Sequence, residues 1–284
     1  CRMMLKAAST YGRSWVDEHV EPGGLVYGDY HIIGARSTRM SASHPNLQQI
    51  PTRDLPIFRK LFISRHEGGR ILVADAWQQE VCILAWFSED ENLRNALLER
   101  RDLHQETADD FGLTRREGKD INLGLVYGMS AAGLASRVGV SLVEAQRGIE
   151  RRNRRYPMVK SWSERQQRHA IAEDFVTSSM GNRLWVNKYD RQWQRHAINL
   201  PIQGTAALHT KIWFTMVHEL ARELGEEFLV PLVVHDEVVM DCPPERVAFW
   251  EKMLPELGAR AGAAAVPGFP MTCGVAAGNS WAAK

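Results

Sequence analysis

Residues 228–242, FLVPLVVHDEVVMDC, decide the fold of this chain. Two apolar, β-prone arms flank the polar trio His235-Asp236-Glu237, which predicts two antiparallel strands that meet at these three residues. An ionised carboxylate is rarely left at such a turn between apolar arms without a partner or a metal ion. Asp236 is therefore the first candidate functional residue.

A second apolar run, RILVADAW at residues 70–77, follows Gly68-Gly69 and predicts a buried strand with Asp75 near its C-terminal end. Taken alone, either aspartate has an ordinary explanation, because an Asp at a strand end often caps the next helix. Taken together, Asp75 and Asp236 can supply hard oxygen ligands to a pair of Mg²⁺ ions. Two metals about 3.5–4 Å apart stabilise both oxygens of a phosphoryl displacement.

The rest of the chain is organised around these strands. Helical patterns broken by Gly and Pro run from residue 78 to about 173, a hairpin is expected at 176–186, and helices are expected at about 193–224 and 245–262. A last strand is expected near 271–275. This order predicts an α+β fold, in which distant segments complete one sheet and a helical subdomain is inserted.

Composition excludes several classes of protein. The chain has 284 residues and a net charge of +1, which counts against a histone-like polycation. Basic residues cluster at 36–39, 147–155 and 191–195, where solvated helix faces remain the alternative to nucleic-acid binding. The four scattered cysteines favour a reducing, cytoplasmic location over a zinc or disulfide framework, and no apolar run reaches the ~18 residues expected of a membrane span.

A further constellation lies at residues 114–128, TRREGKDINLGLVYG. Thr114 and Glu117 have capping-box spacing, which predicts a helix start. Arg115, Lys119, Leu123 and Tyr127 then recur every four residues on one face. Two cations followed by an apolar and an aromatic residue suit a triphosphate that continues into a base, although an ordinary amphipathic helix fits these residues equally well.

Seven stretches, in order along nearly the whole chain, resemble the motifs of family A DNA polymerases. They are Thr38-Arg39-Met-Ser with Pro45-Asn-Leu-Gln-Gln-Ile-Pro, Asp75 to Glu80, Asp102-Leu-His104, Arg115 to Gly128, Gly181-Asn-Arg, Asn199 to Ala207, and Val234 to Glu237. Each stretch alone is weak evidence, whereas seven in the same order are highly specific.

The resemblance implies a right-hand polymerase architecture, with an antiparallel palm sheet and a long helical fingers insertion. It implies a thumb remnant and first part of the palm at 1–88, fingers at 89–190, and a second part of the palm at 191–284. Only Cys1 to about Tyr11 resembles the end of a thumb, so we expect an architecture lacking most of the thumb. Such a chain is expected to bind primer–template weakly, unless a separate thumb, exonuclease or processivity polypeptide supplies the missing contacts.

The resemblance also implies residue roles. The implied catalytic residues are Asp75, Asp236 and Lys119, with Lys119 as a proton donor to departing pyrophosphate. The implied metal ligands are Asp75, the backbone carbonyl of Ala76, Asp236 and, as an auxiliary carboxylate, Glu237; they would hold two Mg²⁺ ions, for which Mn²⁺ can substitute. The implied nucleotide-binding residues are His104, Arg115, Lys119, Leu123, Tyr127, Gln79 and Glu80, of which Glu80 and Tyr127 would block a ribose 2′-hydroxyl. The implied DNA contacts are Arg39, Asn46, Gln48, Arg53, Arg195, Asn199, Gln203 and His235.

The function implied is template-directed addition of deoxynucleoside monophosphates to a primer 3′ end, with release of pyrophosphate. A single-subunit RNA polymerase is one alternative, and Glu80 at the sugar-selecting position argues against it. An idle or partner-dependent, DNA-binding replisome subunit is a second alternative. A metal-dependent hydrolase fits less well, because it would not need the nucleotide-binding helix.

Three departures from the family pattern affect these expectations. Ala76-Trp77 replaces Tyr-Ser, Cys82 replaces an arginine that would accompany Glu80, and Leu123 replaces a Phe or Tyr on the fingers helix. A leucine fills volume but cannot stack on a base. We therefore expect Leu123→Phe to change the use of nucleotides lacking a 3′-hydroxyl, measured as the incorporation ratio of dideoxy- to deoxynucleotide. An unchanged ratio would contradict this prediction.

Overall fold

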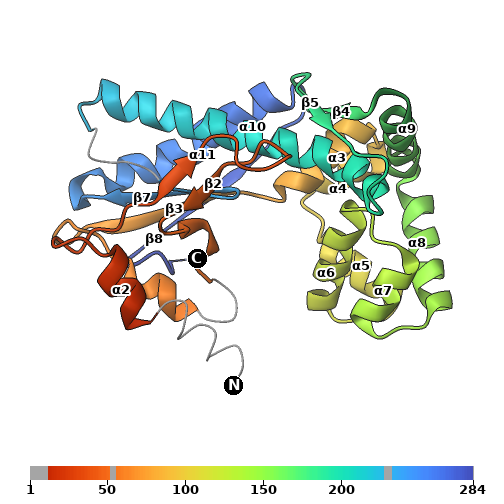
Figure 1. The fold of residues 1–284 in the computed structure, drawn as a ribbon, viewed down its shortest axis with the longest axis horizontal. Helices are drawn as coiled ribbons and strands as arrows, with labels where there is room; N and C mark the ends of the chain where they lie inside the picture. The colour runs from red at the N-terminus through yellow and green to blue at the C-terminus, as the bar shows by residue number, and fades with distance from the viewer. Residues whose placement is uncertain (1–11, 52–55, 227–231, 284) are drawn as a thin grey trace. The chain divides into compact units, whose positions relative to one another are not determined.

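The computed structural model describes residues 12–51, 56–226 and 232–283 (Figure 1). Arg53 and the residues expected to represent the end of a thumb lie outside this part of the chain. The chain divides into two compact units, which we call the sheet unit and the helical unit. The sheet unit comprises Cys1–Trp77, Thr210–Ala261 and Thr272–Lys284, and the helical unit comprises Gln78–His209 and Gly262–Met271.

The unit boundaries differ from the boundaries predicted for palm and fingers. The units meet in the sequence at residues 77/78 and 209/210, whereas the predicted domains meet at 88/89 and 190/191. The two compact units are defined by their internal packing, whereas the palm and fingers are defined by function. The predicted palm and fingers boundaries therefore remain a prediction.

The sheet unit is built on a four-stranded antiparallel sheet with the order β6-β7-β3-β8. Its strands are β3 (Arg70–Ala76), β6 (Leu232–Val234), β7 (Glu237–Cys242) and β8 (Cys273–Gly278). The expected strand at 70–76 and the expected hairpin around His235 are confirmed. The predicted completion of one sheet by segments distant in the sequence is also confirmed, which gives the α+β class.

One face of the sheet packs against the parts of α10 (Trp193–Glu223) and α11 (Val247–Ala265) that belong to this unit (Figure 1). Leu72 and Ala74 of β3 point to this face and are fully buried. Trp213 of α10 and Trp250 of α11 pack on the same core cluster and are fully buried as well. Burial of large aromatic side chains contributes much of the hydrophobic stabilisation of such a core.

The opposite face carries a second core cluster, which includes Ile71, Val73, Ile50 and Trp281. The smaller elements of this unit are α2 (Arg13–His19), β1 (Asp29–His31), β2 (Ser41–Ser43), η1 (Leu47–Gln49), η2 (Pro56–Leu61) and η3 (Pro244–Arg246). Because side chains alternate along a strand, Asp75 lies on the same face as Ile71 and Val73. This face of the sheet therefore carries the first candidate carboxylate.

The helical unit is made of short helices and one hairpin. Its helices are α3 (Gln79–Ser88), α4 (Glu91–Leu98), α5 (Leu103–Phe111), α6 (Arg115–Val126), α7 (Ala131–Val138), α8 (Leu142–Arg155), α9 (Pro157–Glu173) and the first part of α10. The hairpin pairs β4 (Phe175–Thr177) with β5 (Arg183–Trp185), as predicted. No helix in the described ranges is long and apolar enough to cross a membrane.

Asp90 caps two helices of this unit with one carboxylate. Its Oδ1 accepts the backbone N–H of Leu93 at 3.0 Å in α4, and its Oδ2 accepts the backbone N–H of Met158 at 2.9 Å in α9. The N-cap residue of α9, Tyr156, makes no side-chain cap bond of its own. Asp90 is 1% exposed, and its bond to Leu93 is buried while its bond to Met158 is partly buried.

We expect Asp90→Ala to lower the free energy of unfolding by roughly 2–4 kcal/mol, because two caps worth about 1 kcal/mol each are lost and one buried and one partly buried N–H group lose their acceptor. Denaturant-induced unfolding followed by circular dichroism measures the change. Glu173→Ala, at an exposed carboxylate in the last turn of α9, is the matched control. Equal stability of the Asp90 and Glu173 variants would contradict the prediction.

Candidate active site

The sheet unit brings the candidate carboxylates to the end of two adjacent strands. Strands β6 and β7 form a tight hairpin in which Val234 pairs with Glu237, so His235 and Asp236 form its two-residue loop. Asp75 of β3 lies directly opposite Glu237 of β7, and opposite residues of an antiparallel pair point to the same face. Asp75 and Asp236, which are 161 positions apart in the sequence, are thereby placed on neighbouring strand ends.

The turn itself is unusual. His235 has φ 58°, in the left-handed region that favours glycine. A two-residue hairpin usually places Gly at such a position, so the histidine indicates a backbone held by the strands on both sides. The His235 side chain is exposed, consistent with its predicted contact to a primer end.

The residues around Asp75 fit a magnesium site. The donors are carboxylates, the hard oxygen ligands that Mg²⁺ prefers. The neighbour of Asp75 on β8 is Gly274, where an added Cβ would lie 3.9 Å from Asp75 Oδ1, so no side chain of Gly274 covers the carboxylate. Within the described ranges, no three His, Cys, Asp or Glu side chains converge into a ready-made metal cage. Mg²⁺ bound by one or two carboxylates and substrate phosphates does not require such a cage.

Glu237 is engaged in an ion pair. Its Oε2 lies 2.9 Å from Nη1 of Arg59, and both side chains are largely buried, at 12% and 8% exposed. Ala76, the other predicted metal residue, is 3% exposed, and its side chain packs into the core on the α10 and α11 side of the sheet. This placement agrees with the expectation that only the backbone carbonyl of Ala76 could serve as a ligand.

Two of the predicted DNA-contact residues, Gln48 and Asn46, help to hold the β6–β7 hairpin in place. Gln48 is 9% exposed, and its Nε2 donates to the backbone carbonyl of Val233 at 3.3 Å. The Tyr30 hydroxyl donates to the same carbonyl at 3.0 Å, and burial raises the pKa of Tyr30, which keeps this donor neutral. Asn46 accepts the backbone N–H of Gln48 at 3.1 Å and so caps η1. Both bonds to the Val233 carbonyl hold edge strand β6 beside the turn that carries His235 and Asp236.

The remaining predicted DNA contacts are distributed over both units. In the sheet unit, Arg39 is half-buried beside β2. In the helical unit, Arg195 is exposed and donates to the backbone carbonyl of Tyr127 at 3.4 Å. Asn199 and Gln203 follow on α10 and are half-buried, and Oδ1 of Asn199 has no hydrogen-bond partner among the described residues. These three residues lie four positions apart on α10 and so share one helix face.

The predicted nucleotide-binding helix is α6, and its predicted capping box is present. The Thr114 backbone N–H and hydroxyl both donate to Glu117 Oε2, at 2.9 and 2.6 Å, and the Glu117 backbone N–H donates to the Thr114 hydroxyl at 3.4 Å. Arg115 and Lys119 lie on successive turns of α6, while Tyr127 directly follows the helix end at Val126. The side chain of Leu123 lies outside the described part of the structure.

Arg115 is paired with Asp102, the N-cap residue of α5. Arg115 Nε lies 2.6 Å from Asp102 Oδ2, and this bond holds the pKa of Asp102 below its usual range. Asp102 also accepts the backbone N–H groups of His104 and Gln105. Both charged side chains are about half exposed, so the pair contributes little stability, and a more highly charged phosphate can compete for Arg115.

His104 lies beside the same cations. Burial and the charge of Lys119 lower the pKa of His104, so the imidazole is neutral at pH 7. Its Nδ1 lies 3.3 Å from Nδ2 of Asn122, an amide nitrogen that can only donate. The ring hydrogen is therefore on Nε2, which leaves an N–H donor suited to a phosphate oxygen.

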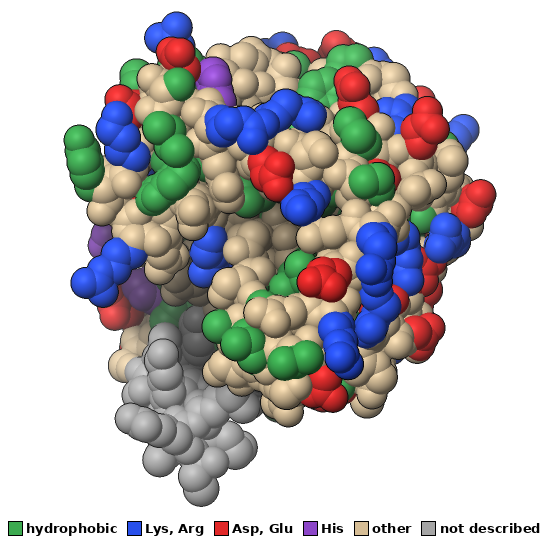
Figure 2. Space-filling view, turned by 90° about the vertical axis from the view of Figure 1, so that its right-hand side faces the viewer, with side chains coloured by type: hydrophobic (Ala, Val, Ile, Leu, Met, Phe, Trp, Pro, Cys, Tyr) green, Lys and Arg blue, Asp and Glu red, His purple; other side chains and the backbone are tan. Residues whose placement is uncertain are grey.

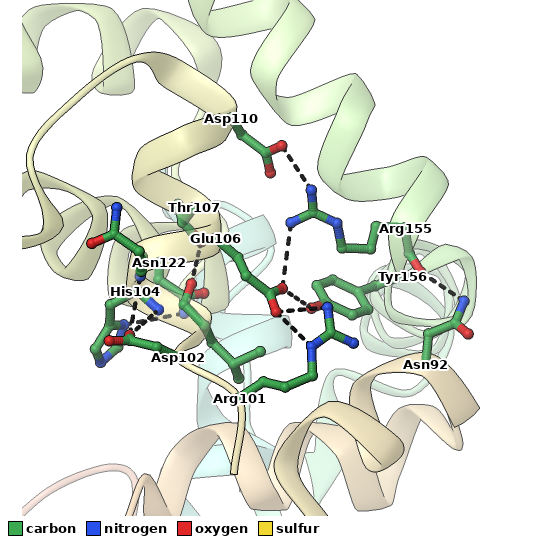
Figure 3. Close-up of polar contacts among 12 residues, drawn as sticks. Asn92, Arg101, Asp102, His104, Glu106, Thr107, Asp110, Asn122, Arg155 and Tyr156 are labelled. Carbon is green, nitrogen blue, oxygen red and sulfur yellow. Dashed lines mark hydrogen bonds and ion pairs between the residues drawn. The ribbon is translucent and has the colours of Figure 1, made fainter. Parts of the chain in front are cut away.

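Helix α5 is fixed on its other side by an ionic network (Figure 3). Glu106 of α5 pairs with Arg101 at 2.6 Å and with Arg155 at 3.6 Å, and it accepts the Tyr156 hydroxyl at 3.2 Å. Arg155 also pairs with Asp110 at 2.8 Å. Because these bonds connect α5 to the C-terminal end of α8, they restrict movement of the helix that carries His104. Sequence reasoning missed this network, whose members are up to 55 positions apart.

The predicted sugar-selecting pair is present in the helical unit. The Tyr127 hydroxyl donates to Glu80 Oε2, which ties the aromatic ring to α3. Cys82, at the position of the family's arginine, is 1% exposed, and burial raises the pKa of its thiol to about 12. Cys82 is thus a neutral core residue. Gln79, a predicted nucleotide contact, is 4% exposed, with its Nε2 2.7 Å from Nδ1 of His209.

The basic run on α8 separates into two sets. Arg152 is buried and Arg155 belongs to the ionic network, whereas Arg147, Arg151 and Arg154 are exposed. Figure 2 shows Lys and Arg side chains gathered in groups among scattered Asp and Glu on the side of the molecule that it presents. Arg152 and Arg155 of this basic run therefore contribute to the packing of the helical unit, whereas the other three arginines are exposed to solvent.

A four-stranded antiparallel sheet with two aspartates at adjacent strand ends, and a helical unit that carries Arg115 and Lys119 on α6 with Tyr127 just beyond it, are features of the right-hand class of nucleic-acid polymerases. Within that class, the chain belongs to DNA polymerase family A, whose family model matches residues 1–283.

Three similar proteins illustrate the relationship. DNA polymerase I of Pseudomonas aeruginosa is 34% identical over 99% of this chain, and DNA polymerase I of Bacillus subtilis is 32% identical over 99%. The chain spans about a third of the length of these relatives (32% and 34%). The solved POL domain of Pol1 from M. smegmatis, in complex with DNA primer-template and dNTP, superposes with a TM-score of 0.86 at 27% identity. That match covers 98% of this chain and 52% of the other.

Proposed function

We propose that this chain carries the catalytic core of a template-directed DNA polymerase, which adds deoxynucleoside monophosphates to a primer 3′ end and releases pyrophosphate. One observation carries the proposal: the strand register that sets Asp75 opposite Glu237 and beside Asp236. Because the chain belongs to DNA polymerase family A, we interpret the two aspartates at these strand ends as metal ligands. Primer–template DNA and deoxynucleoside triphosphates are the proposed substrates.

Asp75 and Asp236, with the backbone carbonyl of Ala76, are the proposed ligands of two Mg²⁺ ions. When bound, the ions activate the primer hydroxyl and stabilise the leaving pyrophosphate, and Mn²⁺ can replace them. Arg115 and Lys119 bind the triphosphate by charge-assisted hydrogen bonds, and His104 donates to it through Nε2. Lys119 also donates a proton to pyrophosphate as it leaves.

The DNA itself is the proposed ligand of a wider set of side chains. Arg195, Asn199 and Gln203, on one face of α10, are proposed to line the template and the minor groove. The other proposed contacts are Arg39, Asn46, Gln48, Arg53 and His235. Gln48 is buried and bonded to Val233, so its proposed effect on DNA binding is indirect: it fixes the position of the β6–β7 hairpin. Supply of further contacts by a separate thumb, exonuclease or processivity polypeptide remains a prediction.

Glu80 and Tyr127 are proposed to exclude a ribose 2′-hydroxyl. We expect Glu80→Ala to lower the discrimination between deoxy- and ribonucleotides by roughly ten- to hundredfold, which corresponds to about 1.4–2.7 kcal/mol. The reason is that the Tyr127 ring loses the hydrogen bond that fixes its position. Single-nucleotide insertion with each sugar, compared as kcat/KM, measures the ratio. Glu89→Ala, at the exposed C-cap of α3, is the control. Discrimination equal to that of the control would contradict the proposed role.

Extension of a labelled primer–template with Mg²⁺ tests the proposed function. We expect extension that follows the template base and requires deoxynucleotides, and we expect Asp236→Ala to abolish it. Binding of primer–template without extension would favour the alternative of an idle or partner-dependent subunit. Extension with ribonucleotides alone would favour an RNA polymerase.

A further inference from the structure

Arg59 is built into the sheet unit beside the proposed metal site. It lies in η2, and its guanidinium carbon is 4.3 Å from the centroid of the Trp281 ring, close to the chain's end. Trp281 is 1% exposed and belongs to the core cluster on the Asp75 face of the sheet. Stacking on a buried indole fixes the plane of the guanidinium.

The partner of this guanidinium is Glu237, with an N–O distance of 2.9 Å. Glu237 is a cross-strand neighbour of Asp75 and a sequence neighbour of Asp236, so three carboxylates lie at one end of the sheet. A carboxylate that is 12% exposed must be paired, protonated or bound to a metal. The ion pair with Arg59 satisfies this requirement without a metal.

We propose that Arg59 is a positioning residue: it holds Glu237 in an ion pair and thereby reserves the metals for Asp75 and Asp236. This inference rests on the proposed function. Without Arg59, the largely buried carboxylate of Glu237 loses its ion pair with the guanidinium, next to a site that attracts divalent ions. It then joins the ligands, and the metal binds more tightly but in a less productive position.

The test measures metal binding separately from catalysis. Mn²⁺ binding is followed by electron paramagnetic resonance, using the whole chain with a terminated primer–template and the complementary deoxynucleotide, so that no reaction occurs. We expect Arg59→Gln to lower the Mn²⁺ dissociation constant about tenfold, while the rate of primer extension with a normal primer falls about tenfold. Loss of packing alone would weaken metal binding instead of strengthening it.

Glu237→Gln supplies the matched background. In that background no carboxylate is released, so Arg59→Gln should change the Mn²⁺ dissociation constant by less than about twofold. A similar change in both backgrounds would mean that the charge of Arg59 acts directly on the metals and would overturn the proposal. Weaker or unchanged Mn²⁺ binding in Arg59→Gln would overturn it as well.

Two further variants keep the test decisive. If thermal unfolding shows that Arg59→Gln does not fold, Arg59→Met replaces it, because methionine keeps an apolar stem against Trp281 but carries no charge. The methionine variant should also tighten Mn²⁺ binding about tenfold, and unchanged binding would overturn the proposal. Asp236→Ala tests the proposed function itself. If the parent chain does not extend primers, and if Asp236→Ala binds Mn²⁺ as tightly as the parent does, the polymerase assignment fails rather than the role of Arg59.

Discussion

Replacing Asp236 or Asp75 with alanine is expected to reduce the rate of primer extension by about a thousandfold or more, which is at least ~4 kcal/mol of transition-state stabilisation. Asp75 lies near the end of β3, and Asp236 lies in the loop that leads into the adjacent strand β7. Removing either one removes a ligand of the ions that offset charge on the attacking and leaving oxygens. Single-turnover extension measures the effect on the chemical step.

Asp241 provides the matched control for these two variants. It lies on β7, five positions after Asp236, and accepts the Ser64 hydroxyl at 2.6 Å at the other end of the strand. Asp241→Asn should leave the extension rate within about threefold of the parent, because it removes a carboxylate from the same strand without touching the proposed metal ligands. An Asp236 variant that retained a tenth of the parent's rate would rule out an essential metal role for this residue.

Lys119→Ala is expected to lower kcat/KM for the incoming nucleotide by roughly a hundred- to thousandfold, about 3–4 kcal/mol. Lys119 lies one helical turn after Arg115 and next to His104, whose pKa its charge lowers. The side chain is expected to act twice, as a phosphate ligand and as a proton donor. Pre-steady-state insertion of one nucleotide measures both the rate and the nucleotide dissociation constant.

Two companion variants separate these roles. Lys119→Arg keeps the charge, but its guanidinium does not give up a proton, so the nucleotide dissociation constant should change little while the insertion rate falls. Arg137→Ala removes an exposed cation from α7, outside the predicted nucleotide-binding helix, and should change neither quantity. Equal losses in Lys119→Ala and Arg137→Ala would reduce the role of Lys119 to general charge.

The strands around Asp236 could be predicted from sequence because their signals are local. Two apolar, β-prone arms on either side of His235-Asp236-Glu237 determine a hairpin. The apolar run that ends at Asp75 determines a buried strand of the same kind. The capping box at Thr114 is equally local, because all three of its bonds join residues three positions apart.

Long-range partners could not be predicted in the same way. Arg59 and Glu237 are 178 positions apart, and nothing in the spacing around either residue indicates the other. Gln48 was expected to contact DNA, yet its side-chain amide donates a hydrogen bond to the backbone carbonyl of Val233, 185 positions away. Gln79 likewise bonds to His209, so a motif position indicates that a residue matters without indicating whether it touches the substrate or supports a residue that does.

The double cap at Asp90 has a consequence for the connectivity of the helical unit. One carboxylate holds the beginning of α4 and the beginning of α9, and Asn92 donates to the backbone carbonyl of Arg155 at 2.9 Å. The segment from α5 to α8 therefore begins and ends at the same place in the helical unit, where α4 and α9 start. Helices α3 and α9 pack on each other independently of this segment, through Phe87 and Trp162, whose rings stack 5.6 Å apart. The predicted nucleotide-binding helix α6 thus lies in a segment whose two ends are held together, and the bond from Tyr127 to Glu80 adds a further attachment to α3.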